Sequence, residues 1–252
     1  MNISPELLKK FESDYRADPS NAVIAGAVAK NGIQDASFNY DVRRRHNFCF
    51  SHETERGEIT NQKKSGRCWM FASLNAARVE IMKKLNLETF ELSQNYTLFW
   101  DKLEKSNYFF ESILETLDEP LEGRLLAHLL ANPIQDGGQW DMFSGILQKY
   151  GAVPKDVMPE TFHSSDTRFF VAELTHRLRK YAQLLRDGHK AGKSLKELRA
   201  DKEAYLSQVY ALLVKALGEP PRVFDFECRD KDKKFHKAEQ ITPQQFFKEY
   251  VG

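Results

Sequence analysis

One stretch of the sequence, residues 61–72, constrains the fold and the chemistry of the chain more than any other. It reads Asn-Gln-Lys-Lys-Ser-Gly-Arg-Cys-Trp-Met-Phe-Ala, and apolar residues recur with helical spacing from its second half onward. Because serine is a favoured N-cap residue, we expect a helix over residues 66–85 with Ser65 as its cap. The spacing therefore predicts that Cys68 lies in the first turn of a helix.

A cysteine in that position has the properties of a nucleophile. The unpaired N–H groups and the dipole of a helix N-terminus favour a negative charge. With a cationic neighbour, they can lower the pKa of a cysteine thiol from ~8.5 to roughly 3.5–7.5. Arg67 is either such a neighbour or a solvated charge at the start of the helix, and the sequence leaves both interpretations open. We therefore treat Cys68 as a candidate catalytic residue.

Residues close to Cys68 add features of an acyl-transfer site. Gln62 offers a side-chain N–H that, together with the backbone N–H of Cys68, can stabilise a developing oxyanion. Gly66 carries no side chain beside the sulfur, so a substrate backbone can come close. Trp69 has the character of a core residue. The pattern indicates a cysteine nucleophile with an amide donor nearby.

These residues resemble the nucleophile region of the papain-like cysteine peptidases, where a glutamine is followed, after five residues, by a Cys-Trp pair. The form Ser-Gly-Arg-Cys-Trp at residues 65–69 resembles the intracellular branch, the bleomycin hydrolases and the bacterial aminopeptidase C enzymes. The resemblance implies that Cys68 attacks a peptide carbonyl and that Gln62 binds the oxyanion. It also implies that Gly66 and Trp69 border the bound substrate.

A second block, Gln-Asp-Gly-Gly-Gln-Trp-Asp-Met at residues 135–142, resembles the Gly-Gly segment of the same branch. Paired glycines can form an edge whose backbone groups meet an extended peptide, although alone they more often mark a turn. The resemblance implies that Gly137 and Gly138 hold the substrate backbone. A third block, residues 92–96, resembles a helix start of the family, and the resemblance covers nearly the whole chain.

A papain-like site also needs a histidine base, which in the family begins a hydrophobic strand about 130–150 residues or more after the cysteine. The histidines downstream of Cys68 are His128, His163, His176, His189 and His236. None has that context, because they lie in predicted helices, a polar turn, or charged and glycine-rich segments. His236 is the one alternative that stays open. We therefore expect the base, and the asparagine that orients it, to lie beyond these 252 residues.

The fold class that we expect is α+β, of the papain-like type, with the helical half, an added helical hairpin and only the start of the β-rich half. The segment from Phe224 to Cys228 alternates apolar and acidic residues as a strand does, and Thr242-Pro243 begins a helix. That helix would have an apolar face with little sequence left to cover it. The predicted parts are an N-terminal helical arm and approach to the nucleophile (1–64), the helical half (65–165), a helical insertion (166–221) and the truncated start of the β-rich half (222–252).

The insertion reads as two long helices, over residues 167–217, broken at Gly188 and Gly192. Ser194 and Glu197 have the spacing of a capping box at the start of the second helix. In the resembled branch, insertions of this kind help to build a ring-shaped homo-oligomer, a hexamer, so the resemblance implies a role in assembly. A local buttress for the domain is an equally open interpretation.

Composition sets looser bounds. A net charge of +1 does not call for a nucleic-acid partner, and the basic run at residues 43–45 is either a solvated turn or a small nucleic-acid patch. No apolar run approaches the ~20 residues of a membrane span, and the sequence begins without a signal-peptide pattern. Cys49 and Cys228 are expected to be small buried residues, and widely separated cysteines make neither a disulfide framework nor a zinc site. A reducing, cytoplasmic compartment fits this cysteine usage, and no cofactor is expected.

Taken together, these features predict a cysteine-type aminopeptidase that removes N-terminal residues from peptides through the Cys68 thiolate, with the catalytic His/Asn half lying outside this chain. The alternative is a catalytically inactive fragment that serves as an assembly or binding module. A downstream histidine followed by a hydrophobic strand would favour the enzyme.

Overall fold

The computed structural model describes residues 2–47, 49–52 and 57–251, and the chain divides into two compact units, residues 1–54 and 55–252. The first unit contains the helices α1 (Pro5–Ala17), α2 (Ser20–Ala36) and α3 (Tyr40–Arg45). Ser4 caps α1 by accepting a hydrogen bond from the backbone N–H of Leu7 at 3.2 Å. None of the described residues of these helices is buried.

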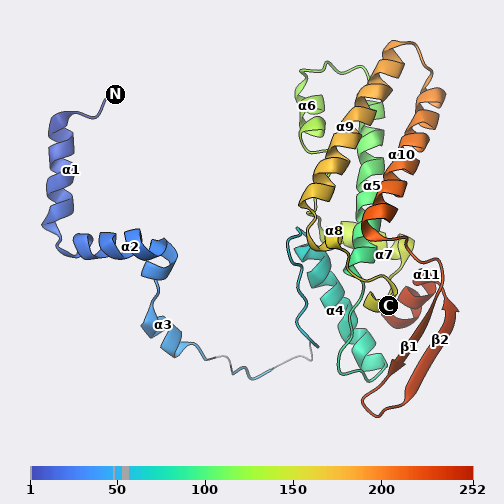
Figure 1. Ribbon diagram of the computed structural model, residues 1–252, viewed down its shortest axis with the longest axis horizontal. Helices are drawn as coiled ribbons and strands as arrows, with labels where there is room; N and C mark the ends of the chain where they lie inside the picture. The colour runs from blue at the N-terminus through green and yellow to red at the C-terminus, as the bar shows by residue number, and fades with distance from the viewer. Residues whose placement is uncertain (1, 48, 53–56, 252) are drawn as a thin grey trace. The chain divides into compact units, whose positions relative to one another are not determined.

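The second unit is mostly helical and contains a small two-stranded sheet (Figure 1). None of the helices in the described ranges is long and apolar enough to cross a lipid bilayer. In chain order the elements are α4 (Cys68–Lys84), α5 (Gln94–Glu115), α6 (Arg124–Ala131), α7 (Trp140–Tyr150), the 3-10 helix η1 (Lys155–Val157), α8 (Phe162–Ser165), α9 (Arg168–Lys190), α10 (Leu195–Leu217), β1 (Phe224–Arg229), β2 (Phe235–Ile241), α11 (Pro243–Phe246) and the π-helical turn η2 (Phe247–Val251).

The helix α5 is the centre of this unit, because α4, α6, α7, α9 and α10 all pack against it. Ser93 caps it by accepting from the N–H of Tyr96 at 3.0 Å, as the Leu-Ser-Gln-Asn-Tyr block predicts. Its buried face includes Phe99, Phe110 and Ile113, which are fully inaccessible to solvent. The core of the second unit therefore forms around one long helix.

The predicted helical hairpin is confirmed as α9 and α10, which lie along α5 (Figure 1). The capping box of Ser194 and Glu197 starts α10, and the rings of Tyr181 and Tyr205 stack between the two helices with centroids 4.6 Å apart. Long apolar stripes on both helices thus cover α5 from one side.

The strands β1 and β2 form an antiparallel pair that packs on the last helical turns of the chain. Thr242 begins α11 through a capping box with Gln245, which confirms the predicted helix start. Phe226 of β1 lies edge-on to Phe246, at 5.2 Å between ring centroids. The inward-facing side of β1 is therefore covered by aromatic residues within the described part of the chain.

Two local predictions are wrong. Ser65 is not the N-cap of α4, because that helix begins at Cys68 and Arg67 occupies the cap position without a side-chain cap bond. Cys49 is exposed, whereas Cys228 is half-buried. A lone cysteine has no obligatory partner, so its residue type does not determine its burial.

Candidate active site

The segment before Cys68 is fixed by backbone pairing to the junction between α8 and α9. The N–H of Lys64 donates to the carbonyl of Ser165 at 2.9 Å, and the N–H of Thr167 donates to the carbonyl of Lys64. Residues 62–68, which we call the Cys68 turn, then lead directly into α4. Cys68 is the first residue of that helix and is exposed to solvent.

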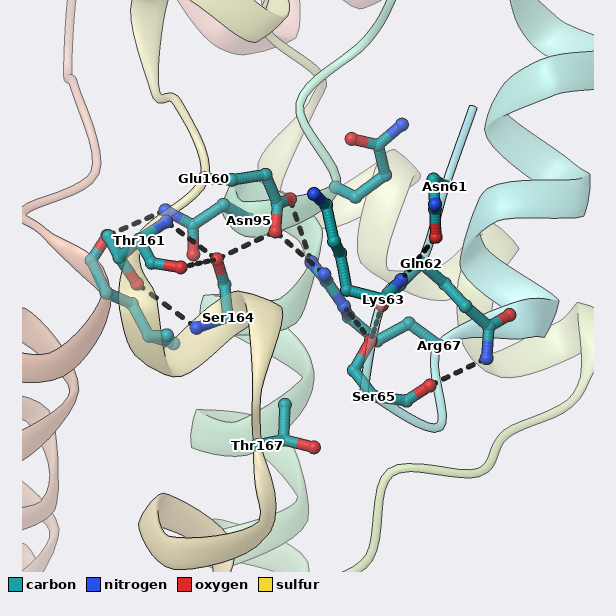
Figure 2. Close-up of polar contacts among 12 residues, drawn as sticks. Asn61, Gln62, Lys63, Ser65, Arg67, Asn95, Glu160, Thr161, Ser164 and Thr167 are labelled. Atoms are coloured by element: carbon teal, nitrogen blue, oxygen red, sulfur yellow. Dashed lines mark hydrogen bonds and ion pairs between the residues drawn. The ribbon is translucent and has the colours of Figure 1, made fainter. Parts of the chain in front are cut away.

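Arg67 is fully buried and makes a two-pronged ion pair with Glu160, with N···O distances of 2.9 and 2.7 Å (Figure 2). Its Nε donates to the hydroxyl of Ser65 at 2.8 Å. Ser164 donates to the same carboxylate at 2.7 Å. Arg67, the residue next to Cys68, is therefore held by hydrogen bonds to both Glu160 and Ser65.

This geometry excludes both interpretations of Arg67 that the sequence left open. It is not a solvated charge, because its side chain has no exposed surface. Neither is it a free cation beside the sulfur, because Glu160 supplies an opposite charge at hydrogen-bond distance. The arginine therefore shapes the Cys68 turn, and Ser65 contributes an acceptor to that arrangement instead of a helix cap.

Gln62 turns back within the Cys68 turn. Its Nε2 donates to the carbonyl of Ser65 at 2.6 Å, while the Ser65 hydroxyl donates to the carbonyl of Gln62 at 2.6 Å. A primary amide has two N–H donors, so one bond to Ser65 leaves the second donor for another acceptor. The amide is thus held in place and keeps a donor for further chemistry.

The segment of residues 135–138, which we call the glycine segment, contacts the Cys68 turn. The indole N–H of Trp69 donates to the carbonyl of Asp136 at 2.8 Å. A Cβ atom at Gly138 would lie 2.6 Å from the Trp69 ring, and a Cβ atom at Gly66 would lie 2.7 Å from the Cβ of Asp136. Gly66, Trp69 and Gly138 are therefore brought together, and the close approach requires both glycines.

Asp136 joins the glycine segment to the Cys68 turn through its side chain. One carboxylate oxygen accepts from the N–H of Gly66 at 3.0 Å and from the hydroxyl of Thr167, and the other lies 2.8 Å from the Nζ of Lys102. Burial alone would raise the pKa of Asp136, but the Lys102 ammonium and these donors lower that pKa to about 2. Asp136 therefore carries a permanent negative charge at physiological pH.

Among the described residues after Cys68, none of the histidines forms a hydrogen bond to its sulfur. His236, the alternative left open by the sequence, bonds to Asp230 of its own hairpin at 3.0 Å. His189 lies in the last turn of α9 and bonds to Asp118 at 2.8 Å. Both rings therefore have partners remote in sequence from the Cys68 turn.

Sequence reasoning missed three residues that shape this site: Lys102, Asp136 as a charged group, and Glu160. Asp136 was visible only as the neighbour of the paired glycines. Lys102 carried a usable signal, because it recurs at helical spacing with Leu98, Ser106 and Phe109, all of which are buried. Glu160 carried no signal, because only tertiary structure brings it to Arg67.

Comparisons with known sequences and structures show which proteins this chain is similar to. The model of the Peptidase C1-like family matches residues 2–252. The chain is 49% identical over 249 residues to an aminopeptidase C of Listeria innocua serovar 6a, and 45% identical over 250 residues to an aminopeptidase C of Lactobacillus delbrueckii subsp. lactis. Each alignment covers 99% of this chain and 56% of the relative. The chain thus spans about half the length of these curated relatives.

A solved structure has the same fold as this chain. The crystal structure of PepW from Lactobacillus rhamnosis HN001 superposes with a TM-score of 0.96 at 47% sequence identity. That match covers 100% of this chain and 56% of the PepW chain. The papain-like fold class expected from the sequence is therefore confirmed.

Proposed function

The chain belongs to the Peptidase C1-like family, and from this membership we propose that the whole protein is a cysteine aminopeptidase with Cys68 as its nucleophile. The observation that carries the proposal is the exposed position of Cys68 at the first residue of α4, beside Trp69 and the glycine segment. Backbone N–H groups at a helix start are oriented toward incoming negative charge.

In the proposed reaction, the Cys68 thiolate attacks the carbonyl carbon of the first peptide bond and forms a carbon–sulfur bond. The backbone N–H of Cys68 and the second amide donor of Gln62 bind the oxyanion that develops. The carbon–nitrogen bond then breaks, and the leaving amine takes the proton that the base had removed from the Cys68 thiol. Water attacks the thioester, which releases the N-terminal residue and regenerates the thiol.

The glycine segment is proposed to hold the substrate. The backbone of Gly138 makes no hydrogen bond to any other described residue, so its N–H and C=O groups are available to an extended peptide. Gly66 and Trp69 border the same surface. The base and the asparagine that orients it are proposed to come from a part of the protein outside these 252 residues.

Finer features of the assignment are also proposals. The Ser-Gly-Arg-Cys-Trp form supports the bleomycin hydrolase and aminopeptidase C branch, and the aminopeptidase names of the relatives support release of N-terminal residues. We further propose that the protein works in the reducing cytoplasm and that the α9–α10 hairpin contributes to a homo-oligomer. The four-part division of the chain at residues 64, 165 and 221 is proposed on the same basis.

The test uses the full-length protein and aminoacyl amide substrates. We expect Cys68→Ala to abolish hydrolysis, and Cys68→Ser to reduce it by several orders of magnitude. The matched control is Cys228→Ser, which alters a half-buried cysteine on β1 and should keep wild-type turnover. Substantial activity in Cys68→Ala would refute the assignment of the nucleophile.

A further inference from the structure

A cluster of buried charges lies beneath the glycine segment. Lys102 has no exposed side-chain surface, Asp101 is 1% exposed, and Lys105 is 14% exposed. All three residues come from one stretch of α5, and Asp136 of the glycine segment completes the cluster. We call these four residues the lysine–aspartate cluster. Its formal charges cancel, which makes burial of all four tolerable.

The two lysines fix the backbone of the glycine segment. The Nζ of Lys102 donates to the carbonyl of Gln135 at 2.8 Å, and the Nζ of Lys105 donates to the carbonyl of Gly137 at 2.6 Å. The carbonyl between them, that of Asp136, accepts from Trp69. Three successive carbonyl groups therefore accept hydrogen bonds from protein donors. Because the carbonyl of Gly137 and the N–H of Gly138 belong to one peptide group, these bonds also orient the N–H of Gly138.

The Asp136 carboxylate extends this control to the Cys68 turn. The same side chain that lies 2.8 Å from Lys102 accepts the N–H of Gly66, a residue 70 positions earlier in the chain. Only Arg67 separates Gly66 from Cys68. The cluster thus connects α5, the glycine segment and the Cys68 turn by hydrogen bonds with defined directions.

Stability alone does not account for this arrangement. Replacing a buried ion pair by apolar side chains of similar size is often neutral or stabilising, because the charges lose their hydration when they are buried. Lys102 lies on a buried stripe of α5 whose neighbouring members Leu98 and Phe109 are apolar. Buried ionic groups are retained in some proteins because they fix one conformation, and the hydrogen bonds of this cluster lead to the glycine segment and the Cys68 turn.

We propose that Asp136, held by Lys102, is a positioning residue for the acyl-transfer reaction. By fixing the peptide N–H of Gly66, it keeps the Cys68 turn aligned with the glycine segment and so sets how the substrate carbonyl meets the sulfur. The inference rests on the proposed function, because it concerns the reaction of Cys68.

The main test compares kcat and KM of full-length wild-type and Asp136→Asn protein on an aminoacyl amide, normalised to the number of alkylatable Cys68 sites. Because a displacement of about 1 Å can cost 10²-fold in rate, we expect kcat/KM per site to fall by about 10- to 100-fold. Thr167→Val is a milder variant, since it removes one donor to the carboxylate oxygen that holds Gly66. It should lower kcat/KM by about 3- to 10-fold, as the loss of one hydrogen bond does.

A pH profile separates positioning from simple destabilisation. In Lys102→Met, Asp136 keeps Asp101 and Lys105 of α5 as its charged neighbours, and the neutral donors of Thr167 and Gly66. Without the adjacent ammonium its pKa rises, so protonation should add a loss of kcat/KM below about pH 5 that wild-type protein lacks. Lys102→Arg, which keeps the positive charge, should restore the wild-type acid limb.

The control is Lys202→Met, which removes a nearly buried lysine that pairs with Glu111 at another point on α5. It should lower the melting temperature and leave kcat/KM per site unchanged. The positioning role is overturned if Asp136→Asn, or Thr167→Val where the former does not fold, behaves like Lys202→Met. If the wild-type protein shows no hydrolysis that depends on Cys68, the proposed function is overturned together with the positioning role. If only the positioning role fails, the wild-type protein still shows that hydrolysis, so the two failures can be distinguished.

Discussion

The Cys68 turn and the α9–α10 hairpin are both connected to α5, but different forces hold them. The hairpin is held mainly by apolar packing, with Leu174, Leu178 and Leu213 fully buried, and Lys202 adds an ion pair to Glu111 of α5. The Cys68 turn is held by charged hydrogen bonds, among them those of Arg67 and Asp136. Apolar burial is non-directional, whereas a hydrogen bond fixes an angle as well as a distance. The contrast indicates that the hairpin supplies stability, whereas the turn supplies geometry in addition to stability.

The largest effect is expected for Arg67→Met, which leaves the Glu160 carboxylate without its cationic partner. Removing one partner of a buried ion pair typically costs about 3–5 kcal/mol. We expect a loss of that order in the free energy of unfolding, measured by denaturant titration of the full-length protein, together with lower kcat per site because Cys68 is the next residue.

Arg67→Lys is the matched control, because it keeps the charge and loses the fork that contacts both oxygens of Glu160. It should recover part of the stability and little of the turnover. If Arg67→Met keeps wild-type kcat per site, then the arginine contributes stability only and the contrast with the hairpin disappears.

A substitution in the hairpin should separate stability from geometry. Leu178 is fully buried in α9, and truncation to alanine removes buried methyl groups and leaves a cavity, at a cost of about 3 kcal/mol. The denaturant midpoint of Leu178→Ala should fall accordingly, while kcat/KM per alkylatable site at 25 °C should stay at the wild-type value. A parallel loss of turnover would show that the hairpin also determines the geometry of the site.

The third prediction concerns pH. The pKa of Asp136 is lowered from 3.8 to about 2 in the folded protein, so the ionised carboxylate stabilises the fold at pH values above about 4. This contribution, about 2 kcal/mol from 1.36 kcal/mol per pKa unit, should be lost as pH falls through about 2. The difference in unfolding free energy between wild-type and Asp136→Asn protein should therefore shrink between pH 4 and pH 2. A difference that is constant over that range would contradict the ionised state.

The difference between the hairpin and the Cys68 turn also explains which structural features could be predicted from the sequence. The hairpin and its capping box follow from periodicity and local residue types, and so does the helix that begins near Cys68. The partners of the Cys68 turn could not be derived in that way, because the bond from Gly66 to Asp136 spans 70 positions and that from Arg67 to Glu160 spans 93. Periodicity identifies faces of elements, while a directed bond between loops depends on the finished packing.

The smallest effect is expected for an exposed ion pair of the hairpin. Arg177 and Glu173 lie one turn apart on α9 with their side chains 42% and 48% exposed, and their N···O distance is 2.6 Å. Solvent screens such a pair, and measured helix pairs of this kind contribute roughly 0.3–0.5 kcal/mol. We therefore expect Arg177→Met to leave kcat/KM unchanged and to shift the denaturant midpoint only slightly, by less at 1 M salt. A loss as large as that of Arg67→Met would mean that burial does not decide which charges matter here, and the distinction between the two regions would fail.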